Sequence, residues 1–96
     1  MTPADPRRDA EWQPRLAARA RIQYDAIACQ DLLLFPEAAL VLNATAAAIV
    51  RLCDGERSVS AIADAVAEQF SARDPAAIAA DVDEFIRQLG ARGLLE

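Results

Sequence analysis

The spacing of hydrophobic residues changes near residue 43, from a pattern typical of strands to one typical of helices. Before that point, one segment alternates so that Ile22 and Tyr24 are predicted to face inward, and two short apolar runs follow. Pro36 and Glu37 separate the two runs and predict a tight turn. The expected strands cover residues 19–25, 32–35 and 39–42. Because sequential strands usually pair, we expect a three-stranded antiparallel sheet in chain order.

After residue 43 the apolar positions recur every three or four residues, which indicates helices with one buried face. Asn43, Ser58 and Asp74 are residue types that cap helix starts. The expected helices cover residues 44–53, 58–70 and 75–91. Their predicted inward residues are Ala46, Ile49, Leu52 and Cys53 in the first, Val59, Ile62, Val66 and Phe70 in the second, and Ile78, Val82, Ile86 and Leu89 in the third, with Phe85 on its flank. Leu94 and Leu95 are expected to fold back onto this core.

The order of these elements defines the predicted fold class. The short links at 54–57 and 71–74 hold the helices in a tight triplet, the arrangement found in winged helix-turn-helix proteins. We therefore expect an α+β, winged helix-turn-helix-like domain over residues 15–96, with the sheet preceding a three-helix bundle. Residues 1–14 contain three of the five prolines and are predicted to be a flexible N-terminal tail. Trp12 in this tail is expected to dock on the domain itself, the alternative being a partner.

Charge and composition narrow the function classes. The chain has 96 residues and a net charge of −5, with no Lys and no His. Residues 36–96 hold the whole excess, with ten acidic residues against five Arg, so a nucleic-acid partner is not expected. The missing His removes the commonest general base and metal ligand, and no cofactor or catalytic activity is expected.

The N-terminus and the cysteines suggest a reducing compartment. No apolar run follows the charged N-terminal residues, and no segment has the roughly 18–20 apolar residues that cross a bilayer, so a cytoplasmic protein without membrane association is expected. Cys29 and Cys53 form no CxxC pair and are interpreted as small core residues. A disulfide or a reactive thiol is the alternative.

An ordered set of short segments resembles one family. The set is Arg21–Asp25, Leu33–Glu37, Leu42-Asn43, Ile49, Leu52–Gly55, Val59 with Ile62, Asp81-Val82, Phe85 and Gly93-Leu94. In this order and spacing, over about residues 14–95, the chain resembles the PqqD family of pyrroloquinoline quinone (PQQ) biosynthesis. One departure is Ala38, where family members often carry Gly, so the backbone φ angle there is expected to be negative.

The resemblance implies a function without chemistry of its own. PqqD-like proteins are winged-helix recognition elements for ribosomally made precursor peptides. They bind the peptide PqqA and present it to PqqE, a radical S-adenosylmethionine (SAM) enzyme that crosslinks a Glu and a Tyr of the peptide. In related modules the peptide adds a strand to the sheet edge and lies against the third helix.

The sequence favours the same mode of binding independently. The third strand is an edge in the simplest sheet, and no Lys, Pro or inward charge blocks its pairing with another chain. Positions 81, 85 and 88 share one side of the third helix and are predicted to form the wall of a groove beside it. The predicted peptide-binding residues are Ala39, Leu40, Val41, Leu42, Asp81, Phe85 and Gln88.

Three alternatives stay open at this stage. The chain could serve another ribosomal-peptide pathway, bind DNA as a winged helix, or act as an oligomerising module. The reading helix of a DNA-binding protein would be 75–91, whose acidic residues repel phosphate. An open edge strand can also pair two copies of the chain, so a homodimer is not excluded.

Overall fold

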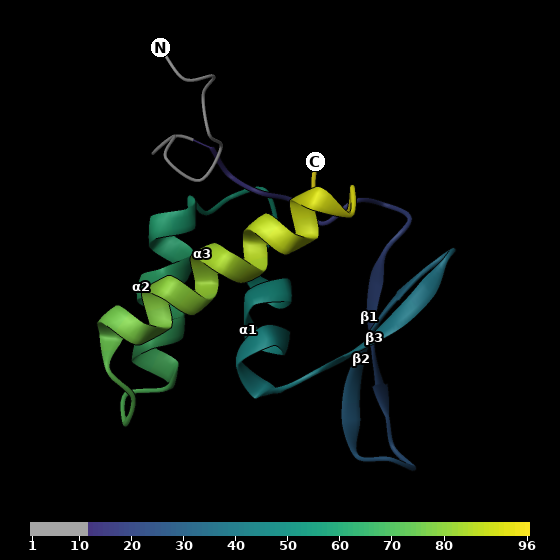
Figure 1. Cartoon of the computed structure of the whole chain (residues 1–96), viewed down its shortest axis with the longest axis horizontal. Helices are drawn as coiled ribbons and strands as arrows, with labels where there is room; N and C mark the ends of the chain where they lie inside the picture. Colours follow the sequence, from purple (N-terminus) through teal and green to yellow (C-terminus); the bar gives the residue numbers. More distant parts are fainter. Residues whose placement is uncertain (1–11) are drawn as a thin grey trace.

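A three-stranded antiparallel meander forms one side of the molecule (Figure 1). The structure is a computed structural model that describes residues 12–96. It contains β1 (Arg21–Asp25), β2 (Gln30–Phe35) and β3 (Ala38–Leu42), with β2 in the centre. This confirms the predicted strand order and the turn at Pro36-Glu37, which joins β2 to β3. The φ angle of Ala38 is not positive, as expected.

Three helices follow the sheet directly, as predicted. They are α1 (Ala44–Leu52), α2 (Val59–Gln69) and α3 (Pro75–Ala91). The side chains of Asn43, Ser58 and Asp74 each accept a hydrogen bond from a backbone N–H in the first turn of the helix that follows. In Figure 1, α1 lies between the sheet and the other two helices, and α3 is the longest element. Within residues 12–96, no helix is both long and apolar enough to span a bilayer.

The core consists of two clusters that share α1. The cluster between the helices contains Ala48, Ile49, Cys53, Val59, Ile62, Val66, Ile78, Val82 and Ile86. The cluster between the sheet and the helices contains Ala20, Leu33, Leu42, Ala47, Val50, Leu89 and Leu94. The predicted inward residues of the first helix all pack in the core, since Ile49 and Cys53 are buried and the half-buried Ala46 and Leu52 pack against the clusters. The prediction missed Ala47, Ala48 and Val50, which are also buried. Two sides of α1 are covered, and a single stripe of inward residues does not describe such a helix.

The first strand differs from its prediction in its first residue and in the exposure of Tyr24, whereas its end at Asp25 is as predicted. It begins at Arg21, because a turn closed by the hydrogen bond from the Ala20 N–H to the Ala17 carbonyl precedes it. Tyr24 was predicted to face inward but is 58% exposed. It lies opposite Asp31, whose carboxylate is bound to Arg51 of α1 at 2.8 Å. The ion pair between Asp31 and Arg51 thus lies next to the exposed Tyr24 ring at this end of the sheet.

The segment before β1 is hydrogen-bonded to two distant parts of the chain. The Leu16 N–H donates to the Cys53 carbonyl and the Ala17 N–H to the Leu94 carbonyl, so the segment lies between the α1–α2 loop and the C-terminal residues. Pro14 is buried, and Trp12 packs against the cluster between the helices. Trp12 thus docks on the domain itself, whereas the first eleven residues of the predicted tail lie outside the described part of the chain.

Candidate functional site

The backbone of β3 offers hydrogen-bonding groups on its open side. Phe35 and Ala38 flank a two-residue turn, the position of a hydrogen-bonded pair in a hairpin. Hydrogen-bonded and free positions then alternate along β3, so Leu40 bonds to β2, whereas Ala39 and Val41 direct N–H and C=O away from it. Within residues 12–96 no further strand pairs with this side of β3. Four backbone groups are therefore free to bind an added strand.

The sheet has a second edge at β1, but only the β3 edge adjoins the third helix. Two adjoining cavities lie between β3, the start of α1 and α3; we call them together the β3–α3 groove. The first, of about 280 Å³, is lined by Leu40, Val41, Leu42, Asn43, Ala46, Phe85, Gln88, Leu89 and Arg92. The second, of about 260 Å³, is lined by Asn43, Thr45, Ala46, Ile49, Arg73, Asp81, Glu84, Phe85 and Gln88.

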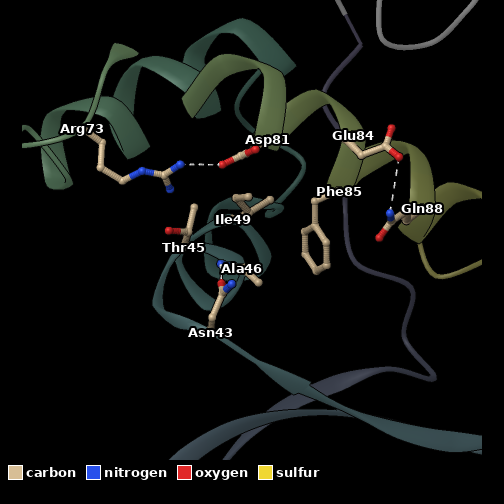
Figure 2. A pocket seen from close by; sticks show the side chains of 9 residues that line it. All are labelled: Asn43, Thr45, Ala46, Ile49, Arg73, Asp81, Glu84, Phe85 and Gln88. Atoms are coloured by element: carbon tan, nitrogen blue, oxygen red, sulfur yellow. Dashed lines mark hydrogen bonds and ion pairs between the residues drawn. The ribbon is translucent and has the colours of Figure 1, made fainter. Parts of the chain in front are cut away.

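Phe85 divides the groove into its two compartments. Its ring hangs from α3 toward Ala46 and Asn43 of the α1 start, and these three residues line both cavities (Figure 2). The side chain is half-buried and packs against both core clusters. Phe85 thus presents an aromatic surface to a ligand in the groove, while its packing against the two core clusters fixes the position of its ring.

The charged side chains and Gln88 that line the second cavity, which lies beside the start of α1, are already paired with one another. Arg73 donates to Asp81 at 2.9 Å, and Gln88 donates to Glu84, as the dashed lines of Figure 2 show. Glu84 also pairs with Arg87. All of these side chains are exposed, so each pair contributes little to stability. They give this compartment a polar rim over an apolar floor that includes Ile49.

The groove brings together most of the residues predicted for the site. Leu40, Val41, Leu42, Asp81, Phe85 and Gln88 all line it, whereas Ala39 contributes only its outward backbone. The side chain of Val41 is 65% exposed and points away from the helices, while Leu42 is buried beneath the groove. Sequence reasoning did not predict the remaining lining residues, because nothing in the sequence shows which side of α1 meets α3 or how far the groove extends along α3. These residues are Asn43, Thr45, Ala46, Ile49, Arg73, Glu84, Leu89 and Arg92.

The two cysteines differ in burial: Cys53 is buried and Cys29 is exposed. Burial, with a smaller contribution from the neighbouring carboxylate of Asp54, raises the pKa of Cys53 from its ordinary value of 9.0 to about 12. The prediction of a core residue is confirmed for Cys53 and wrong for Cys29, which is exposed in the β1–β2 turn with φ of 55°. Both thiols are free, and neither lines the groove. Within residues 12–96 no group of three or more His, Cys, Asp or Glu side chains could hold a metal ion.

An open edge strand beside a helix-walled groove, on a sheet followed by three helices, defines a small module of the winged-helix type. The family described as Coenzyme PQQ synthesis protein D (PqqD) matches residues 32–95. The chain belongs to the PqqD family, as the resemblance of its sequence predicted.

Relatives and a solved structure agree with this assignment. The chain is 40% identical over 82 residues to a PqqA binding protein of Rhizobium meliloti, covering 85% of this chain and 83% of that one. It is 41% identical over 85 residues to a PqqA binding protein of Xanthomonas oryzae pv. oryzae, covering 88% and 91%. The solution structure of the PqqD part of Methylobacterium extorquens PqqCD, described as a functional, stand-alone recognition element for ribosomally synthesised and post-translationally modified peptides (RiPPs), matches with a TM-score of 0.71 and 34% identity, covering 86% of this chain and 87% of that one.

Proposed function

We propose that this protein binds the precursor peptide PqqA as a fourth strand on β3 and presents it to the radical SAM enzyme PqqE. The observation that carries the proposal is the row of outward backbone groups of Ala39 and Val41 beside the β3–α3 groove, which is lined by Leu40, Val41 and Leu42 of the same strand. The relatives named PqqA binding protein support the identity of the peptide. The protein acts as a peptide chaperone and carries out no reaction itself.

A peptide strand on β3 places alternate side chains in the groove. In a sheet, side chains opposite each other lie on the same face, so the peptide residues opposite Leu40 and Leu42 point toward α3. The residues opposite Ala39 and Val41 point to the other face, on which the Val41 side chain is 65% exposed. The groove therefore receives every second residue of the peptide, and its two compartments accept successive inward side chains.

The expected free energy fits a carrier that must also release its peptide. Four ladder hydrogen bonds contribute roughly 2–6 kcal/mol net. Two apolar side chains in the compartments add roughly 1.5–3 kcal/mol each. Ordering the peptide and restricting its translation offset several kcal/mol of this sum. At the favourable end of these ranges the binding free energy is about −8 kcal/mol, which corresponds to a Kd of about 1 μM.

Strand addition leaves parts of the bound peptide exposed, and this supports its presentation to PqqE. Half of the peptide side chains in the bound segment, and both flanks of the peptide, face away from the groove. A modifying enzyme can reach the flanks while the segment stays anchored. The absence of His in the chain supports a binding role, because the commonest acid–base catalyst is missing.

Isothermal titration of the protein with synthetic PqqA tests the binding step. We expect one site with a Kd of about 1 μM, and slower amide exchange at Ala39 and Val41 in the complex. A precursor peptide from an unrelated RiPP pathway serves as the control, and preference for that peptide would assign the chain to another pathway. Absence of binding to PqqA would refute the proposal.

A reconstituted reaction tests the presentation step. PqqE is incubated with PqqA alone or with one equivalent of this protein, and crosslinked peptide is measured by mass spectrometry. We expect crosslinking to depend on the protein and to be lost with variants that no longer bind PqqA. Equal crosslinking with and without the protein would reject presentation while leaving peptide binding intact.

A further inference from the structure

Of the four charged residues that line the β3–α3 groove, three are already compensated. Arg73 pairs with Asp81, and Glu84 pairs with Arg87. Arg92, at the other end of the groove, has no carboxylate partner among residues 12–96. The groove thus carries one uncompensated charge, and it is a cation in a protein whose net charge is −5.

The position of Arg92 along β3 is fixed by its neighbours. Arg92 is the C-terminal cap of α3, and its carbonyl accepts a hydrogen bond from the Arg19 guanidinium at 3.1 Å. The same Arg19 forms an ion pair with Glu37 at 2.8 Å, in the turn that precedes β3. The backbone of Arg92 therefore lies toward the Pro36-Glu37 turn, and its side chain lines the first compartment together with Leu40. The charges of Arg92, Arg19 and Glu37 sum to one positive charge.

We propose, on the basis of the function proposed above, that Arg92 selects peptides with a carboxylate two residues from an apolar anchor. The peptide residue opposite Leu40 points into the first compartment, which is lined by Leu40, Leu89 and Phe85 and accepts an apolar side chain. The peptide residue opposite Ala38 lies on the same face, one step nearer the turn and Arg92. A Glu or Asp there pairs with the guanidinium as the strand docks.

The spacing also reports the direction of the bound peptide. If the peptide runs antiparallel to β3, the apolar residue precedes the acidic one by two positions. If it runs parallel, the acidic residue comes first. The position of the selected carboxylate in the PqqA sequence therefore distinguishes the two directions.

A competing role for Arg92 is purely structural. A cation at a helix C-terminus interacts favourably with the helix dipole, and its exposed side chain needs no partner for that. This role predicts lower thermal stability on substitution and no dependence on the charges of the peptide. Charge exchange between protein and peptide separates the two roles, because only a direct ion pair is restored by reversing both partners.

The experiment uses the full chain, synthetic PqqA, and PqqA variants in which each acidic residue is replaced by Lys in turn. Arg92→Glu is expected to weaken binding of PqqA about tenfold, through loss of one ion pair and a new repulsion. One Lys variant, with its substitution two positions from an apolar residue, is expected to restore most of this loss. Arg21→Glu is the matched control, because it makes the same charge change at the β1 edge, away from the groove.

Each outcome decides between the proposals. Equal binding by the Arg92 and Arg21 variants, or a loss that no Lys variant of PqqA restores, would overturn the role of Arg92 and leave strand addition on β3 intact. A wild-type protein that fails to bind PqqA at all would overturn the proposed function, and the role of Arg92 with it. Thermal melting of both variants shows whether either substitution acts through the stability of the fold.

Discussion

Replacement of Val41 by Pro removes one outward hydrogen-bond donor from the open edge of β3. The Val41 N–H points away from β2, so the sheet itself keeps all its hydrogen bonds. The proline ring also clashes with the peptide carbonyl that this N–H would have bound. The peptide strand is then displaced, which loses the second bond of the pair, from the peptide N–H to the Val41 carbonyl. At about 0.5–1.5 kcal/mol for each bond, the loss is about 1–3 kcal/mol, which weakens PqqA binding roughly fivefold to 150-fold.

A matched variant on the other edge of the sheet isolates the effect of position. Asp31 bonds to Leu42 of β3, so Tyr24, which lies opposite Asp31 on β1, also directs its N–H to open solvent. Tyr24→Pro therefore removes the same kind of group from an edge strand outside the β3–α3 groove. Titration calorimetry with PqqA and thermal melting are measured for both variants.

The expected result is weak or undetectable binding by Val41→Pro and unchanged binding by Tyr24→Pro, with both proteins folded. Unchanged binding by a folded Val41→Pro variant would refute strand addition on β3. Equal losses for the two variants would show that proline acts through the sheet as a whole, and the assignment of the peptide to the β3 edge would then fail.

Three further predictions test the groove and the core. Phe85→Ala is expected to weaken PqqA binding about tenfold or more, because an aromatic wall of both compartments is lost, whereas Phe70→Ala, which removes another half-buried ring outside the groove, should leave the Kd unchanged in the same titration. The buried thiol of Cys53 has a pKa of about 12 in the folded state against 9.0 ordinarily, so the free energy of unfolding should fall by about 1.4 kcal/mol per pH unit above pH 9. Urea titrations at pH 8 to 10.5 should show this extra slope in the wild type and its absence in Cys53→Ala; identical slopes would contradict burial of the thiol. Ser58→Ala removes the hydrogen bond from the Ala61 N–H and should lower stability by about 1 kcal/mol in urea denaturation, with PqqA binding unaffected; an unchanged midpoint would show that the cap contributes nothing.

Local signals predicted the elements well because they act within a few residues. Asp74 followed by Pro75 marks the start of α3, whose predicted bounds agree with the structure. The turn at Pro36-Glu37 follows from residue types that disfavour a continuous strand. These signals depend on backbone conformation and capping, which neighbouring residues determine without help from the rest of the fold.

The errors arose where a residue's surroundings come from distant segments. Alternation places Tyr24 on the inner face of the sheet correctly, but the pattern cannot show that its ring is exposed next to the ion pair between Asp31 and Arg51. Cys29 is a small apolar residue of the type usually found in cores, but it lies in the turn between β1 and β2 with a φ of 55°, a conformation that its residue type does not signal.

The sequence by itself determined the order of strands and helices, the buried stripe of α3, and membership of the PqqD family. Only the tertiary structure decided that the start of α1 lines the space between β3 and α3, that Phe85 divides this space, and that Arg92 lies at one end of it without a carboxylate partner in the described chain. The reason is physical: periodicity reports which side of an element avoids water, whereas a groove depends on how two elements far apart in the chain pack around α1.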